Sequence, residues 1–116
     1  MKISDVADIL DAKIVCCEEL SDSDVCSACG SDMMSDVLAF VKDQAVLLTG
    51  LINTQVIRTA EMMDMRCVVF VRSKKPNDEM ISLAEKCGIV VMTTERRMYE
   101  ACGLLYTHGL NNYIKG

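Results

Sequence analysis

The chain has 116 residues, of which 51% are hydrophobic and 25% charged, a balance typical of one compact globular domain and not of a disordered chain. Its apolar runs fall far short of the roughly 20 residues that cross a bilayer, and residues 1–5 do not resemble a secretory signal, so we expect a cytoplasmic protein with no membrane partner. The net charge of −5 is concentrated in residues 1–44, where ten acidic residues stand against three basic ones. This acidic half, together with only 4% aromatic residues, speaks against a nucleic-acid-binding protein.

The first part of the chain predicts two helices and two strands. Ser4 is expected to cap a short first helix that turns Val6, Ile9 and Leu10 inward. Strands are expected at residues 13–18 and 25–29, with the acidic turn 21–24 between them. After Asp32, helical spacing recurs at four apolar positions, which predicts an amphipathic helix. These positions are Met34, Val37, Leu38 and Val41.

Three apolar stretches, at residues 45–49, 67–71 and 89–93, consist mainly of β-branched or aliphatic residues, and their starts are 22 residues apart. Each is followed by a helical pattern, so the spacing predicts alternating parallel strands and helices. Uninterrupted apolar strands are typical of sheets that are covered on both faces. We therefore expect a single domain over residues 1–116, with a three-layer α/β/α fold and a mostly parallel sheet of about five strands.

The two helices between these strands have clear end signals. Asn53 or Thr54 is expected to cap the first of them. The second is expected to begin at Pro76-Asn77, and Gly88 is suited to the left-handed residue that ends it.

After the last strand, Thr93 or Thr94 is expected to cap a final helix that ends near Gly109. His108, the only histidine, lies at the end of this helix, where an imidazole binds the last carbonyl groups well. With His108 in that role, no Ser/His/Asp, Cys/His or multi-histidine site can be built around a second histidine, and neither GxxxxGK[ST] nor GxGxxG occurs. We therefore predict that the protein is not an enzyme.

In an open parallel sheet, ligands bind beyond the carboxyl ends of the strands. Three loops are expected there, at residues 49–54, 72–75 and 93–96, and they offer hydroxyl groups, cations and the N–H groups of helix starts, which suit an anionic ligand such as a nucleotide. The candidate ligand-binding residues are Thr49, Gly50, Asn53, Thr54, Arg72, Ser73, Lys74, Thr93 and Thr94. Helix capping and solvated surface charge are the alternative explanation for these residue types.

Cys26 and Cys29 form a CxxC pair, which makes them the candidate thiol or metal site. In an extended segment their side chains point to opposite faces, and no second CxxC completes a set of four ligands. The seven cysteines are therefore expected to be reduced and mostly packed as small hydrophobic side chains, and we predict no metal and no cofactor.

The order of five segments, at residues 32–39, 48–51, 58–61, 69–74 and 92–94, resembles the DRTGG domain family over residues 13–110. That family occurs beside CBS domains and in some phosphotransacetylases, and its fold is similar to that of the N-terminal domain of HPr kinase/phosphorylase. The resemblance implies a three-layer α/β fold and an accessory, regulatory or ligand-sensing role.

The resemblance also places the loop at residues 49–53 where the family has its DRT segment, and Arg72-Ser73-Lys74 where it has paired glycines. This chain has Leu51-Ile52 and Ser73-Lys74 at those positions instead. A kinase needs a phosphate-cradling loop, which the sequence lacks, so we predict no kinase activity.

Three functions remain open from the sequence. The first is a non-enzymatic regulatory or sensory module that binds a small anionic ligand, such as a nucleotide, at the strand ends. The second is an interaction module that forms a homodimer or docks on an enzyme partner. The third is a thiol or metal function at Cys26 and Cys29.

Overall fold

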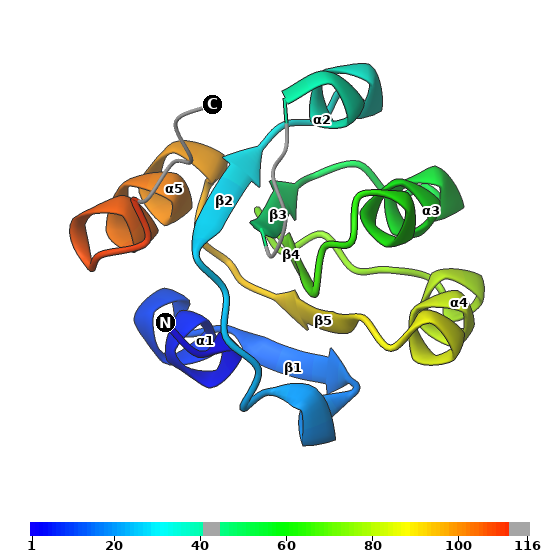
Figure 1. Ribbon diagram of the computed structural model, residues 1–116, viewed down its shortest axis with the longest axis horizontal. Helices are drawn as coiled ribbons and strands as arrows, with labels where there is room; N and C mark the ends of the chain where they lie inside the picture. The colour runs from blue at the N-terminus through cyan, green and yellow to red at the C-terminus, as the bar shows by residue number, and fades with distance from the viewer. Residues whose placement is uncertain (41–44, 112–116) are drawn as a thin grey trace.

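The computed structural model describes residues 1–40 and 45–111. Its strands form one sheet in the order β1-β5-β4-β3-β2, in which β2 to β5 run parallel and β1 runs antiparallel to β5 (Figure 1). The strand bounds are Lys13–Cys16 for β1, Ser27–Gly30 for β2, Ala45–Thr49 for β3, Cys67–Phe70 for β4 and Val90–Thr93 for β5. The three stretches spaced by 22 residues are thus neighbouring parallel strands, as their spacing predicted.

Helices cover both faces of this sheet (Figure 1). Their bounds are Ile3–Leu10 for α1, Met34–Phe40 for α2, Thr54–Met62 for α3, Asp78–Cys87 for α4 and Met98–Thr107 for α5, and a short 3-10 helix, η1, spans Glu18–Leu20. Helices α1 and α5 pack on one face, and α2, α3 and α4 pack on the other. The predicted three-layer α/β/α fold with a mostly parallel five-stranded sheet is confirmed.

The apolar strands form the core because both of their faces are buried. In β3, Val46 and Leu48 face α1 and α5, whereas Ala45 and Leu47 face the other helical layer, and all four side chains are excluded from solvent. Burial of this apolar surface is the main favourable contribution to folding. Across the described ranges, 1–40 and 45–111, no helix is both long and apolar enough to cross a membrane.

The helix ends between the parallel strands follow their local signals. Asn53 caps α3 by accepting a hydrogen bond from the N–H of Gln55, and Asn77 caps α4 by accepting one from the N–H of Met80. Gly88 ends α4 in the left-handed conformation, with a φ of 70°. These predictions are confirmed. The helix ends could be predicted from the sequence because each signal acts within a few residues of its own helix.

Two predicted helix caps are wrong. Helix α1 begins one residue before Ser4, and the Asp5 carboxylate accepts a hydrogen bond from the N–H of Lys2 there. Helix α5 begins at Met98, four residues beyond Thr94; the Thr94 hydroxyl oxygen accepts from the N–H of Arg96, before the helix, while the hydroxyl donates to the carbonyl oxygen of Leu10 at 2.8 Å. Neither Ser4 nor Thr94 therefore caps the helix that it was predicted to cap.

Two strand predictions need their bounds corrected. Strand β1 ends at Cys16, because Cys17 adopts a left-handed conformation that starts η1, and β2 spans Ser27–Gly30 in place of 25–29. Leu38 was expected to face inward but is 41% exposed on α2. Val41, the fourth apolar position predicted for this helix, lies outside the described residues.

Candidate functional site

The carboxyl ends of β2, β3, β4 and β5 lie side by side at one edge of the sheet, which we call the rim. Because β1 runs the opposite way, its first residue, Lys13, also lies at this edge, paired with Thr93 at the end of β5. The rim therefore contains the loops that follow β2, β3, β4 and β5, and the segment that precedes β1. This is the edge at which open α/β sheets bind ligands.

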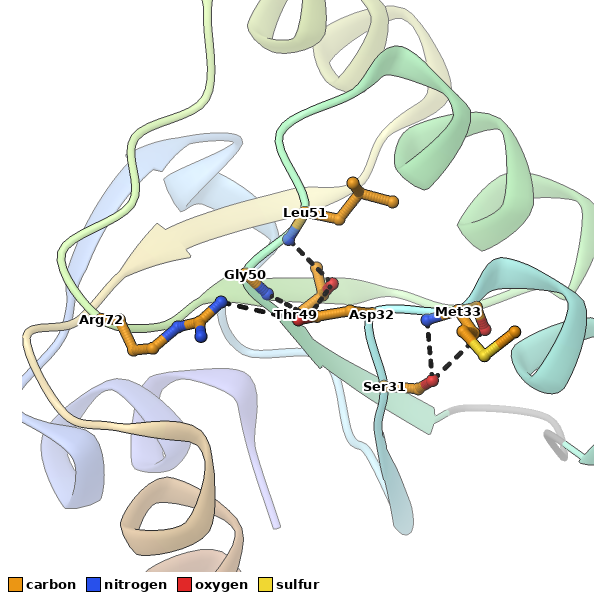
Figure 2. Close-up of polar contacts among 7 residues, drawn as sticks. All are labelled: Ser31, Asp32, Met33, Thr49, Gly50, Leu51 and Arg72. Carbon is orange, nitrogen blue, oxygen red and sulfur yellow. Dashed lines mark hydrogen bonds and ion pairs between the residues drawn. The ribbon is translucent and has the colours of Figure 1, made fainter.

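Asp32 organises the rim on the β2 and β3 side (Figure 2). Its Oδ1 accepts hydrogen bonds from the Thr49 hydroxyl at 3.0 Å and from the Gly50 N–H at 2.7 Å. Its Oδ2 forms an ion pair with the Arg72 guanidinium at 3.5 Å. One carboxylate therefore joins the loops after β2, β3 and β4, and we call these four residues the Asp32 cluster.

The turn that carries Asp32 is built locally. The Ser31 hydroxyl oxygen accepts a hydrogen bond from the N–H of Met33 at 3.0 Å, and this turn directs the intervening Asp32 side chain toward β3 (Figure 2). On the β3 side, the Thr49 hydroxyl oxygen accepts from the N–H of Leu51 at 3.2 Å. The Thr49 side chain is fully buried, and its hydroxyl group both donates to Asp32 and accepts from Leu51.

The loop after β4 has a strained backbone and is held in place by the loop after β5. Arg72 and Ser73 both have a φ of 59°, in the left-handed region that residues other than glycine rarely adopt. Two backbone hydrogen bonds hold this turn, from the Arg72 N–H to the Arg96 carbonyl at 2.8 Å and from the Ser73 N–H to the Thr94 carbonyl at 2.9 Å. Left-handed residues cost of order 1–3 kcal/mol each and persist where surrounding structure holds them.

On the β5 and β1 side, the rim opens into a cleft of about 720 Å³ between the end of α1, the start of β1 and the loops after β4 and β5. Three of its side chains are cations and three are carboxylates. The lining residues are Leu10, Asp11, Lys13, Ser73, Lys75, Thr93, Thr94, Glu95, Arg96 and Glu100.

Arg96 spans one wall of this cleft. Its Nε donates to the Leu10 carbonyl at 3.1 Å, and its NH1 group pairs with the Glu100 carboxylate at 3.0 Å. Within the described part of the chain, the ammonium groups of Lys13 and Lys75 make no hydrogen bond or ion pair. Lys13 and Lys75, together with the carboxylates of Asp11 and Glu95, are therefore the charged cleft groups that no described partner matches.

A sequence profile of the DRTGG domain family matches residues 5–107. The chain belongs to the DRTGG domain family. Among solved structures, it is similar to the crystal structure of the CBS and DRTGG domains of the regulatory region of Clostridium perfringens pyrophosphatase, complexed with its activator, diadenosine tetraphosphate. The two structures superpose with a TM-score of 0.70 at 18% sequence identity, over 90% of this chain, which supports the fold. This chain spans 45% of the length of the pyrophosphatase chain. No curated protein matches this sequence.

The nine residues predicted as the ligand site fall into three groups in this DRTGG domain. Ser73, Thr93 and Thr94 line the cleft. Thr49, Gly50 and Arg72 belong to the Asp32 cluster. Asn53 caps α3, Thr54 is its first residue, and Lys74 is exposed without lining the cleft. The structure thus separates the predicted residues along the rim.

Several rim residues were missing from that set, among them Asp32, Lys75, Arg96 and Lys13. Asp32 directly follows a strand, which is a usable signal for a rim carboxylate, and Lys75 and Arg96 stand in the loops predicted to reach the rim. Lys13 gave no such signal, because it reaches the rim through the antiparallel direction of β1.

Cys29, one member of the candidate CxxC pair, is poorly suited to thiol chemistry, as are Cys16 and Cys102. Burial raises the pKa of Cys29 and Cys102, and burial together with the neighbouring Cys17 raises the pKa of Cys16 to about 12. A thiol that stays protonated at neutral pH is a weak nucleophile and metal ligand. Over residues 1–40 and 45–111, no group of three or more histidine, cysteine, aspartate or glutamate side chains is arranged to hold a metal ion.

His108 ends α5 as its position predicted. Its Nδ1 lies 2.7 Å from the Leu104 carbonyl oxygen, one turn back along the helix. It lies beside a second, smaller pocket and is not among the residues that line the cleft.

Proposed function

We propose that this DRTGG domain is a non-catalytic regulatory module whose cleft binds a phosphate-bearing ligand such as a nucleotide. The observation that carries the proposal is the meeting of Lys13, Lys75 and Arg96 around one cleft from three separate segments of the chain. Its volume of about 720 Å³ lies within the range of ~300–1,000 Å³ usual for small-molecule sites.

The cleft holds three cations and three carboxylates, so its cations suit a ligand with anionic groups and its carboxylates suit a ligand that also carries hydrogen-bond donors. Lys13 and Lys75 are free to neutralise phosphate oxygens, and Arg96 is held in place through its Nε while its second terminal nitrogen remains available for an anion. The hydroxyl of Ser73 lies in the same lining and supplies a neutral hydrogen-bond donor. The carboxylates of Asp11 and Glu95 are suited to donors such as ribose hydroxyls and to bound cations.

The family context supports a regulatory role. The similar pyrophosphatase structure is of a regulatory region, and it was determined with an activator that contains adenosine and phosphate groups. A non-catalytic role is supported by the position of the only histidine, which is bonded to the Leu104 carbonyl outside the cleft. We propose that an enzyme is the partner whose activity this module regulates.

The test is isothermal titration of the purified chain with diadenosine tetraphosphate, ATP, inorganic triphosphate and adenosine. Lys75→Ala removes a cleft cation, and Lys74→Ala is its matched control because Lys74 is the adjacent exposed lysine outside the cleft. We expect Lys75→Ala to weaken binding about tenfold and Lys74→Ala to change it less than about twofold.

The four ligands separate the sources of affinity. Binding of inorganic triphosphate as tight as that of ATP would show that the cleft recognises phosphate alone, whereas tighter binding of ATP would show recognition of the nucleoside as well. Failure of every phosphate-bearing ligand to bind at about 1 mM would overturn the proposal. Equal losses in Lys74→Ala and Lys75→Ala would also overturn it, because binding would then follow net charge and not the cleft.

A further inference from the structure

The two outermost strands of the sheet, β1 and β2, differ in the features of their free sides, which we call the strand edges to distinguish them from the rim. Strand β1, at one edge, carries the exposed Lys13, contains an irregularity between Ile14 and Cys16, and runs directly into η1. A lysine, a bulge and a covering turn are the devices by which proteins prevent a strand edge from pairing with another chain. The edge at β1 is therefore protected.

Strand β2, at the opposite edge, has none of these features. Its sequence is Ser27-Ala28-Cys29-Gly30, and the surrounding residues 25–31 contain no charge and no proline. Its register with β3 is regular over all four residues. Ala28 and Gly30 are exposed, and β3 is the only strand that pairs with β2 in the described part of the chain.

The backbone groups of β2 that point away from β3 can be identified. The Ser31 N–H donates to the Leu48 carbonyl oxygen, so Ser31, Cys29 and Ser27 direct their hydrogen-bonding groups toward β3. Neighbouring residues of a strand alternate, so the N–H and C=O groups of Ala28 and Gly30 point outward. This edge is a template for one more strand.

Exposed aromatic side chains border the same edge. Met98 and Cys102 of α5 lie against Gly30, so this side of α5 packs on β2. Tyr99 and Tyr106 lie three residues before and four residues after Cys102, which places them on the same ridge of the helix. They are 94% and 62% exposed. Figure 1 shows β2 as the outermost strand, with α5 on one face and α2 on the other.

We infer that β2 pairs antiparallel with β2 of a second copy of this chain, to give one continuous sheet across a two-fold axis. A two-fold axis perpendicular to the sheet places each strand opposite itself, so any charge in β2 would lie close to its own copy, and β2 has none. The same axis brings both α5 helices to one face, where the two tyrosines of each copy contact the other copy.

The experiment is sedimentation equilibrium of the wild-type chain and of Ala28→Lys, Ala28→Glu and Ser82→Lys. Ser82 is an exposed position on α4, on the β5 side of the sheet, so Ser82→Lys is a control for the added charge. We expect the wild type and Ser82→Lys to have twice the monomer mass of 12.8 kDa, and the two Ala28 variants to be monomers. An equal mixture of the Ala28 variants should form dimers, because a lysine then lies within reach of a glutamate across the axis.

Rescue in the mixture separates loss of pairing from loss of folding, because unfolded variants would not associate specifically. The double variant Tyr99→Ser/Tyr106→Ser provides a second test that leaves β2 unchanged, and we expect its dimer to dissociate at least about tenfold more readily. A monomeric wild-type chain would overturn the inference. A dimer that persists in Ala28→Lys as it does in Ser82→Lys would also overturn it, since the contact would then lie elsewhere.

Discussion

The Arg72 guanidinium lies directly over the α-carbon of Gly50 on its way to Asp32 (Figure 2). A β-carbon at residue 50 would overlap the terminal nitrogen of Arg72. Gly50 is buried and does not have a positive φ, so the glycine is required here for space and not for an unusual backbone conformation. The contact between Gly50 and Arg72 therefore packs the loop after β3 against the loop after β4.

The first prediction concerns Gly50→Ala. The added methyl group should displace Arg72 and break its ion pair with Asp32, and since that pair is about half exposed and Arg72 is flexible, the free energy of unfolding should fall by less than about 1 kcal/mol. Urea denaturation of Gly50→Ala, Arg72→Ala and the double variant measures the coupling. In the Arg72→Ala background the alanine should cost almost nothing. An equal cost in both backgrounds would show that the clash is with another part of the chain.

The second prediction concerns the carboxylate of Asp32. Asp32→Ala removes the acceptor of the Gly50 N–H and the buried Thr49 hydroxyl, and should lower the free energy of unfolding by about 1–3 kcal/mol. Asp32→Asn keeps an Oδ1 acceptor and should cost less. Asp36→Ala, on the exposed side of α2, is the control and should change stability by less than about 0.5 kcal/mol. Equal costs for Asp32→Ala and Asp36→Ala would refute the organising role of Asp32.

The fold was predictable from the sequence where the determining interactions are local or periodic. Strands β3, β4 and β5 are uninterrupted apolar runs because both faces of each strand are buried, and burial of this kind leaves a clear pattern. The caps Asn53 and Asn77 act on N–H groups two or three residues away. These elements therefore carry their own signals in the sequence.

The arrangement of the rim was less predictable because it depends on contacts between distant segments. Thr94 is a residue type that often caps helices, but here its hydroxyl joins the turn before α5 to α1, by accepting from the N–H of Arg96 and donating to the carbonyl of Leu10, 84 residues away in sequence. Asp32 and Thr49 meet only after β2 and β3 pair. Lys13 reaches the cleft through the antiparallel direction of β1, which the apolar pattern of that strand does not encode.

The third prediction tests the link between Thr94 and α1. The buried Thr94 hydroxyl donates to the Leu10 carbonyl and accepts from the N–H of Arg96, so Thr94→Val should lower the free energy of unfolding by about 1–3 kcal/mol. Thr107→Val is the matched control. The Thr107 hydroxyl is exposed and bonds only within its own helix, so the change there should stay within about 0.5 kcal/mol. Similar losses in both variants would contradict a special role for Thr94.

The fourth prediction is that the domain loses stability in alkaline solution through its buried thiols. Burial and the neighbouring Cys17 raise the pKa of Cys16 from its ordinary value of 9.0 to about 12, and burial raises the pKa of Cys67 as well. Between these pH values the unfolded chain loses thiol protons that the folded chain keeps. The free energy of unfolding should therefore be unaffected by these thiols below pH 9 and fall as the pH rises from 9 toward 12.

Urea denaturation in the presence of a reductant, at about pH 8 and about pH 10.5, measures this fall. Cys16→Ala removes one of the responsible thiols, so the difference between its free energies of unfolding at the two pH values should be smaller than that of the wild type. Ionisation of lysine side chains contributes in both proteins, so it cancels when the two differences are compared. If the wild type and Cys16→Ala lose the same free energy, the alkaline loss does not come from Cys16. If the wild type is equally stable at both pH values, the thiols are accessible enough to ionise in the folded domain, and their burial does not control their protonation.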